Sequence, residues 1–266
     1  MSIDIRPFER VVEHKTTDIE GSTLIIPSIS IGNVPQLAID LLIHTYNFVK
    51  IGNLDSIYLY PFSSPIDTAP DPEIVERTKG VSSALEVYYN DKLKVSIIQQ
   101  RSPILPSFTS TYINEVIIPF LAGGKFSEVL ILDSSDAGLL EDFQPGKIQV
   151  YTNEDLLNNS LGSLNILKKD AIQLSSKYPY DHSVYAGLLI KALDELNLKS
   201  ESSIDLNVLV AYVYEGDNFQ DGEILANKVN SILDLEQITS WIKPLSWLGA
   251  YGDKPVPNAM EEGLFG

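Results

Sequence analysis

The sequence predicts a single α/β domain in which helices cover both faces of one sheet. Short apolar runs of the kind that form buried strands alternate along the chain with stretches whose apolar residues recur at helical spacing. The chain has 266 residues, 44% of them hydrophobic, so it can bury one sizeable core. It contains no internal repeat and no low-complexity run, and we therefore expect neither a repeat array nor a disordered body.

The first elements are a strand over residues 23–31 and the helix that follows it. The helix is marked by apolar residues three and four positions apart: Val34, Leu37, Ala38, Leu41 and Leu42. We expect Asn33 to cap its N-terminus, with Pro35 in the first turn. Gln36 follows the cap by three residues, as in a capping box.

A short strand over residues 57–60 comes next and is followed by a proline-rich loop. Two further strands, over residues 85–89 and 93–98, flank a polar turn that begins at Asn90. Short apolar runs around such a turn are typical of a β-hairpin.

The middle of the chain is predicted to form a helix over residues 112–121 that ends at Gly123 and Gly124. A short buried strand over residues 129–132 follows. The next clear helical pattern covers residues 185–196.

The start of that helix offers two candidate caps, Asp181 and Ser183. A late strand over residues 208–213 and a helix over residues 225–233 complete the regular elements, and Asp221 is the expected cap of this last helix.

Beyond Trp241 the sequence changes in character. Proline and glycine, which suit neither a regular helix nor a central strand, become frequent: Pro244, Gly249, Gly252, Pro255, Pro257 and Gly263. We therefore expect one α/β domain over residues 1–248 and an extended tail over residues 249–266.

The chain is strongly acidic, with 36 Asp and Glu against 19 Lys and Arg and a formal charge of −17. A field of this sign repels phosphate backbones and anionic lipid, so we expect no nucleic-acid or membrane partner, and a basic protein surface is the more natural counterpart. No signal peptide and no apolar stretch of the roughly 20 residues that span a bilayer is seen. The expected location is the cytoplasm, with the nucleus as a second compartment.

The sequence lacks the common motifs of catalytic, nucleotide-binding and metal sites. The chain has no cysteine, which removes thiolate nucleophiles and zinc–thiolate sites. The turn after the first strand has one glycine, Gly32, where a dinucleotide fingerprint needs three. The three histidines, His14, His44 and His182, lack metal-ligand spacing, and His182 is expected to be a partly exposed residue before a helix. The acidic loop after residue 213 does not fit an EF-hand, because Phe219 stands at a ligand position.

Four carboxylates follow the strand over residues 129–132: Asp133, Asp136, Glu141 and Asp142. Active-site carboxylates of α/β enzymes often lie just beyond a strand end, where a pair of them can act as general acid and base. Solvated loop charges explain the four equally well. We predict no catalytic residue, no cofactor and no metal.

Two stretches carry a resemblance to a known family. The first runs over residues 24–43 and contains Gly-Asn-Val-Pro-Gln-Leu-Ala-Ile-Asp-Leu from Gly32. The second runs from residue 210 through Glu-Gly-Asp-Asn at Glu215 to Pro-Leu-Ser-Trp at Pro244. Together they resemble the proteasome assembly chaperone 2 family over nearly the whole chain, although residues 55–177 match only in their order of elements.

The resemblance implies a three-layer α/β/α fold of the nucleoside-phosphorylase type without its catalytic apparatus. It also implies an obligate heterodimer with a related chaperone that caps the α-ring of the proteasome core particle. A C-terminal hydrophobic–tyrosine–any-residue motif of the family enters pockets between α-subunits. Here the corresponding residues are Leu264, Phe265 and Gly266, with phenylalanine in place of tyrosine.

Two functions from different classes remain, a chaperone that binds protein surfaces and a small-molecule enzyme of the nucleosidase or phosphorylase type. The chaperone is favoured because an apolar C-terminus is present and no catalytic set is assembled. Aromatic residues in the proline-rich stretches also need cover that local helices do not supply: Tyr58, Tyr60, Phe62 and Phe108. We therefore expect the protein to be stable only with its partner chain.

Overall fold

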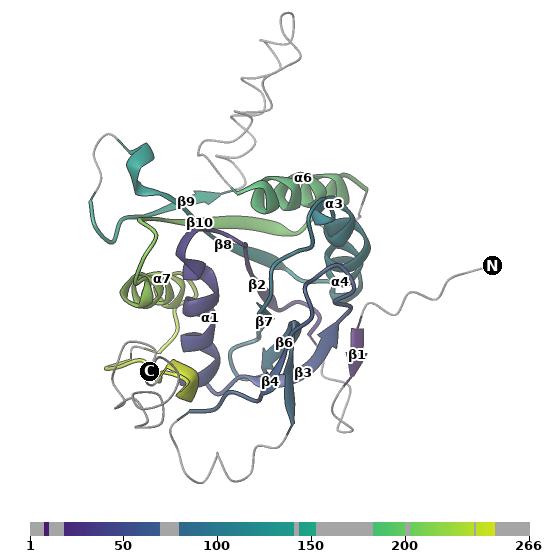
Figure 1. The fold of residues 1–266 in the computed structure, drawn as a ribbon. Helices are drawn as coiled ribbons and strands as arrows, with labels where there is room; N and C mark the ends of the chain where they lie inside the picture. The colour runs from purple at the N-terminus through teal and green to yellow at the C-terminus, as the bar shows by residue number, and fades with distance from the viewer. Residues whose placement is uncertain are drawn as a thin grey trace, which may run out of the picture.

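The computed structural model describes residues 8–10, 19–69, 80–140, 144–152, 183–199, 203–236 and 238–247 (Figure 1). Eight strands form one sheet, which from edge to edge contains β1 (Phe8–Arg10), β3 (Val49–Leu54), β6 (Leu85–Asn90), β7 (Val95–Gln100), β2 (Thr23–Pro27), β8 (Glu128–Asp136), β10 (Asp205–Val213) and β9 (Ile148–Thr152). The middle strands β7, β2, β8 and β10 are parallel, and the outer pairings are antiparallel. A separate small pair contains β4 (Ser63–Pro65) and β5 (Val81–Ser83).

Helices cover both faces of the sheet (Figure 1). One face carries α1 (Val34–Thr45) and α7 (Phe219–Ile232). The other carries α3 (Thr109–Tyr112), the π-helical turn η2 (Ile113–Ile117), α4 (Ile118–Gly124) and α6 (Val184–Lys199). The predicted α/β class and the three-layer arrangement are confirmed, whereas the likeness to a nucleoside-phosphorylase-type fold stays a prediction. None of the described helices is long and apolar enough to span a bilayer.

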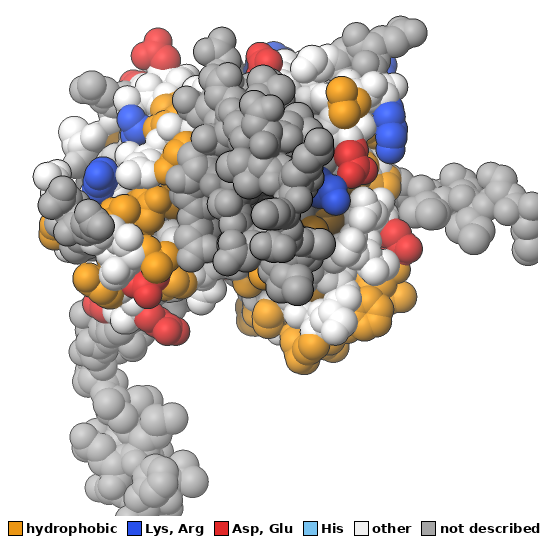
Figure 2. Space-filling view, turned by 90° about the horizontal axis from the view of Figure 1, so that it is seen from above, with side chains coloured by type: hydrophobic (Ala, Val, Ile, Leu, Met, Phe, Trp, Pro, Cys, Tyr) orange, Lys and Arg blue, Asp and Glu red, His pale blue; other side chains and the backbone are white. Residues whose placement is uncertain are grey.

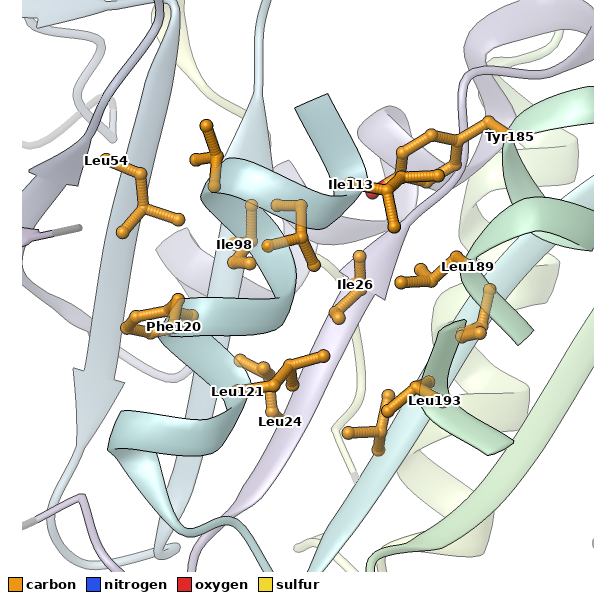
Figure 3. Packing of buried hydrophobic residues seen from close by; sticks show 14 of the residues in the cluster. Leu24, Ile26, Leu54, Ile98, Ile113, Phe120, Leu121, Tyr185, Leu189 and Leu193 are labelled. Atoms are coloured by element: carbon orange, nitrogen blue, oxygen red, sulfur yellow. The ribbon is translucent and has the colours of Figure 1, made fainter. Parts of the chain in front are cut away.

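The central strands are buried on both faces because their side chains alternate between the two helical layers. In β2, Leu24 and Ile26 belong to the core under η2, α4 and α6, and Ile25 belongs to the core under α1 and α7. Figure 3 shows Leu24 and Ile26 facing Leu121 of α4 and Leu189 of α6. These five side chains are at most 1% exposed, so β2 is the centre of both apolar cores.

The layer of α1 and α7 depends on two close contacts made by glycines. A Cβ atom on Gly222 of α7 would lie 2.8 Å from Cβ of Leu37 in α1. Gly32, which precedes α1, has a φ of +66°, and a Cβ there would lie 2.3 Å from Oδ1 of Asn218. The loop after β2 therefore packs directly against the start of α7.

The start of α1 differs from the predicted capping box. Asn33 adopts a left-handed conformation (φ 51°) and its side chain makes no cap hydrogen bond. An N-cap side chain reaches the first turn from an extended backbone, and the left-handed backbone of Asn33 does not place its side chain for such a bond. Gln36 donates from Nε2 to the carbonyl oxygen of Ser28 (2.9 Å) instead of reaching back to the cap. Pro35 lies in the first turn, as predicted, and β2 ends at Pro27 rather than at residue 31.

The strand predicted over residues 57–60 is wrong. Residues 57 and 58 form a turn, and Leu59 makes a single bridge with Ile104. The strand in this region is β3, whose apolar pattern is interrupted by polar and small residues at positions 50, 52 and 53. Its pairing with β1 and β6 stabilises it despite that weak local pattern.

Two predicted features of the middle of the chain are confirmed. β6 and β7 form the hairpin, with their turn over residues 91–94. Residues 112–121 are helical, and the helix continues to Gly124, with Pro119 directly after the π-helical turn η2, near the start of α4.

Of the caps predicted for the two later helices, one is found in the structure and one is not. Ser183, one of the two predicted candidates, caps α6, since its Oγ accepts from the backbone N–H of Ala186 at 3.1 Å. α7 begins at Phe219, earlier than predicted, so Asp221 lies in its first turn instead of capping it. There Oδ2 of Asp221 accepts from Nδ2 of Asn218 at 2.8 Å.

The contact between α1 and α7 predicts that Gly222→Ala destabilises the protein, although alanine favours a helix over glycine. The new methyl group would overlap Cβ of Leu37, which cannot rotate away, so we expect the free energy of unfolding to fall by about 1–3 kcal/mol in urea denaturation. Gly123→Ala in α4 is the matched control, because no heavy atom lies within 4 Å of its Cβ position. A neutral or stabilising Gly222→Ala would show that the two helices are not closely packed.

Candidate interaction surface

A group of exposed apolar side chains lies on two neighbouring loops, residues 55–62 and 103–108. The exposed fractions are 68% for Ile57, 45% for Tyr60, 37% for Phe62 and 43% for Phe108. We call these residues, with the partly buried Tyr58, the aromatic patch. Figure 2 shows hydrophobic side chains gathered at the margins of one face of the molecule, with charged side chains scattered between them.

The aromatic patch is held in a fixed shape by contacts between its two loops. The N–H of Tyr60 donates to the carbonyl oxygen of Pro103 (3.0 Å), and the N–H of Leu105 donates to that of Tyr58 (2.8 Å). The rings of Tyr58 and Phe108 stack with centroids 5.5 Å apart. The hydroxyl of Tyr58 also donates to Glu115 of η2. The structure thus brings together all four aromatic residues singled out in the sequence, of which Tyr58 is partly covered by Phe108.

A hollow of about 420 Å³ lies beside the aromatic patch, and Phe62 contributes to its wall. It lies at the carboxyl ends of the parallel neighbours β2 and β7, whose following segments lead to α1 on one face and α3 on the other. Such a reversal is a topological switch point, the usual position of ligand sites in α/β folds. We call it the switch-point hollow.

Two residues that line this hollow, Asp40 and Arg101, belong to a largely buried network of four charged side chains. The guanidinium of Arg101 lies between two carboxylates, 3.1 Å from Oε2 of Glu86 and 3.3 Å from Oδ1 of Asp40. Lys50 approaches Oε1 of Glu86 from the other side at 2.5 Å, and the hydroxyl of Tyr88 donates to Oε2 at 3.0 Å. Glu86 is fully buried, so it depends on these partners.

The pKa values of the two carboxyl groups of the network are shifted in opposite directions. Burial by itself would raise the pKa of Glu86, but the hydrogen bond from Lys50 and the charge of Arg101 together hold it below its usual value. Burial raises the pKa of Asp40, and Arg101 and a hydrogen bond from Gln99 oppose the rise without cancelling it. Arg101 therefore stabilises the charged form of both carboxylates.

The carboxylates suspected of acid–base chemistry are not assembled for it. Asp133 lies inside β8 with no exposure, and it accepts hydrogen bonds from the hydroxyl of Ser28 and the N–H of Ser134 (3.0 Å). The prediction that it follows the strand as a loop charge is wrong, because β8 continues to Asp136. Burial raises the pKa of Asp133. Asp136 accepts from the N–H of Gly138 (2.8 Å) and so caps a short turn, η3 (Ala137–Leu139).

His44 lies in α1, where burial lowers its pKa. Across the described ranges no three His, Asp or Glu side chains gather in a way that could hold a metal ion. Several residues named from the sequence lie outside the described residues: His14, Glu141, Asp142, Asp181, His182, Leu264, Phe265 and Gly266. The expected division at residue 248 therefore stays a prediction.

Sequence reasoning missed the charged network. Its members come from α1, β3, β6 and the end of β7, and no spacing along the chain links them. A faint signal was available, since Glu86 interrupts an apolar strand and Asp40 interrupts the apolar side of a helix. Unexplained charges inside apolar elements indicate buried pairing.

The network predicts that Arg101→Met is strongly destabilising, because it leaves two carboxylates buried without their shared cation. We expect the free energy of unfolding at neutral pH to fall by about 3–5 kcal/mol. Because Arg101 lowers the pKa of both carboxyl groups, removing it raises both pKa values relative to the parent protein. Protonation then favours folding of the variant more than folding of the parent, so the loss of stability shrinks as the pH falls. In the parent protein the lowered pKa of Glu86 stabilises the folded state at neutral pH. This stabilisation is lost as the pH falls through that pKa.

Urea denaturation of both proteins at several pH values measures this difference. Lys94→Met is the control, since the ion pair of Lys94 with Asp91 is open to solvent on both sides and should matter little at any pH. A loss that is small, or that does not change with pH, would contradict the assignment.

The sequence matches the PAC2 family model over residues 24–199. Proteasome assembly chaperone 2 of Saccharomyces cerevisiae is 30% identical, over 87% of this chain and 95% of that protein. Proteasome assembly chaperone 2 of Homo sapiens is 28% identical, over 90% of this chain and 95% of that protein.

Solved structures support the fold. Pyrococcus furiosus PbaA, described as an archaeal homologue of proteasome-assembly chaperone, superposes with a TM-score of 0.57 at 17% identity, over 88% of this chain and 89% of that one. Pyrococcus furiosus PbaB, described as an archaeal proteasome activator, gives 0.55 at 19% identity, over 88% and 91%. The resemblance seen in the sequence is confirmed, and the chain belongs to the PAC2 family.

Proposed function

We propose that this protein is a non-catalytic proteasome assembly chaperone. The observation that carries the proposal is its match to proteins named proteasome assembly chaperone 2 over about nine-tenths of their length and its own. The acidic charge of −17 suits binding to basic protein surfaces. We place its action in the cytoplasm, with the nucleus as a second compartment.

In this proposal the protein works as a heterodimer with a related chaperone, and the pair binds the α-ring of the proteasome core particle. The aromatic patch supports the heterodimer, since Tyr60, Phe62 and Phe108 present large rings to solvent from a fixed backbone. Aromatic side chains are enriched in protein interfaces, where they lose little conformational entropy on binding.

The alternative, a nucleosidase or phosphorylase, has weaker support. Asp133 is fully buried, and its carboxylate accepts hydrogen bonds from Ser28 and Ser134. It therefore cannot contact a substrate unless the surrounding structure unfolds. Arg101 and Asp40 do line the switch-point hollow, but they are engaged with each other.

Copurification tests the proposal directly. The tagged protein, expressed in its own cells, should bring down proteasome α-subunits together with a second chaperone. The purified protein should show no saturable hydrolysis or phosphorolysis of nucleosides. Saturable turnover, with no proteasome subunit recovered, would favour the enzyme instead.

The aromatic patch gives a prediction about the heterodimer. Replacing Tyr60 and Phe108 by serine should lower recovery of the partner chaperone at least tenfold, because each ring buried in an interface contributes about 1.5–3 kcal/mol. Ile242→Ser is the control, since Ile242 is 38% exposed and lies outside the patch. Recovery of the partner is measured by quantitative mass spectrometry, and equal loss in the control would show that the patch is not the interface.

The tail gives a second prediction. We propose that Leu264, Phe265 and Gly266 dock in a pocket between two α-subunits. The segment after Pro257 reaches about 30 Å when extended, at roughly 3.3 Å per residue, enough to leave the globular body. Deleting residues 264–266 should weaken binding of the heterodimer to purified core particle at least tenfold, since two apolar side chains lose about 1.5–3 kcal/mol each.

The deletion should leave the thermal unfolding midpoint unchanged, which separates docking from folding. Phe265→Tyr is the opposite test, because a tyrosine hydroxyl can add one hydrogen bond worth about 0.5–1.5 kcal/mol and so tighten binding. Binding that is unaffected by the deletion, also when the partner's tail is removed, would contradict tail docking.

A further inference from the structure

The aromatic patch is bordered by negative charge. Residues 55–69 and 102–124, which include its two loops, contain three acidic residues and no lysine or arginine. Two of the three lie at the patch: Asp55 begins the first loop, and Glu115 lies in η2, which follows the second loop. Both residues are exposed. We call these two carboxylates the acidic rim.

Tyr58 of the aromatic patch lies within reach of both carboxylates of the acidic rim. Its hydroxyl donates to Glu115, and Oδ1 of Asp55 accepts from the backbone N–H of Ile57 at 3.0 Å. The hydrogen bond to Glu115 raises the pKa of the Tyr58 hydroxyl, and the charges of Glu115 and Asp55 raise it further. Both carboxylates therefore act on the same ring of the patch.

The charge of the acidic rim has no counterion within the part of the chain that the structure describes. The donors to Asp55 and Glu115 are a backbone N–H and a phenol, which are neutral, and no ion pair among the described residues includes either carboxylate. Asp40 and Glu86 differ, because each lies beside the guanidinium of Arg101. The negative charge of the rim is therefore open to a partner that covers the patch.

The rings of the patch do not by themselves choose between partners. Apolar surface binds without direction, so the patch could also cover the same patch on a second copy of this chain across a twofold axis. Such a pairing would bring two acidic rims to one interface, where like charges are unfavourable. A related chaperone with lysine or arginine around its own apolar surface would instead meet opposite charge, which also speeds association.

We propose that the acidic rim selects the related chaperone over a second copy of this chain. Asp55 and Glu115 pair with lysine or arginine side chains that border the matching surface of that chaperone, while the aromatic rings supply most of the affinity. This inference rests on the proposed heterodimer and adds the chemistry by which the partner is recognised. It requires that neutralising the rim weakens binding to the partner and strengthens binding to a second copy.

Two isosteric substitutions remove the charge of the rim and keep its hydrogen bonds. In the rim variant, Asp55→Asn with Glu115→Gln, each amide retains an oxygen that accepts from the same donor. The shape of the patch should therefore be unchanged, and thermal melting of the heterodimer checks that the variant is folded like the parent.

The matched control is Asp205→Asn with Glu236→Gln, which removes the same two charges elsewhere. Both residues are exposed. Asp205 begins β10 and Glu236 follows α7, so they lie at the end of the sheet opposite to the loop that follows β7. The control therefore reports the effect of total charge alone.

Competition between partners gives the first readout. Tagged and untagged copies of the full chain, both with the same substitutions, are expressed with the related chaperone found by copurification. Capture of the tag followed by quantitative mass spectrometry gives the ratio of untagged copy to related chaperone. The second readout is the dissociation constant of the purified heterodimer in about 0.1 M and about 1 M sodium chloride, where charges act over roughly 10 Å and roughly 3 Å.

We expect the rim variant to raise the ratio of copy to chaperone about threefold or more, because the repulsion between copies and the attraction to the partner are both lost. The dissociation constant of its heterodimer should rise by a similar factor at the lower salt concentration. At the higher concentration the rim variant and the parent should bind alike, and the control should match the parent throughout.

Equal dissociation constants for the rim variant and the parent at the lower salt concentration, or a ratio that does not rise, would show that the inference is wrong while the chaperone function stands. A loss of α-subunits alone would also overturn it, because the rim would then face the proteasome. If the parent chain recovers no related chaperone, the heterodimer itself is refuted and the inference with it.

Discussion

Burial of both faces of the parallel strands is the constraint on which the rest of the structure depends. β2 shows it most simply, with Leu24 and Ile26 in one core and Ile25 in the other. Strands of this kind need a helical layer on each side, so the segments after β2 and β7 must leave in opposite directions. The hollow between them follows from that requirement and is not an accident of the loops.

The charged side chains of the network are largely buried, so each of them needs a partner of opposite charge. Arg101 forms ion pairs with two carboxylates, those of Asp40 and Glu86. Lys50 and the hydroxyl of Tyr88 also donate to Glu86. The same position that holds catalytic groups in many α/β enzymes is here filled with charges that pair with one another. A surface shaped in this way, with the aromatic patch at its side, suits the recognition of a protein better than the turnover of a substrate.

Close packing made possible by glycines also shapes the helical layer that contains α1 and α7. Gly222 lets α7 approach α1, and Gly32 lets the loop after β2 pack against Asn218. These positions fall in the two stretches that carry the family resemblance. Their part in the resemblance therefore has a physical basis in close packing, and it does not require a ligand at the turn.

The sequence by itself determined the α/β class, the β6–β7 hairpin and the family, because each depends on local periodicity, turn chemistry or a contiguous motif. It left two candidate caps for α6, Asp181 and Ser183, and the structure shows Ser183 in that role. Its local rules failed at Asn33 and Asp221, where the caps differ, and at residues 57–60. In those places the packing of distant segments outweighs the preference of a few residues. Only the tertiary structure joined Asp40, Glu86 and Arg101, since their pairing depends on distances across three elements that no spacing along the chain encodes.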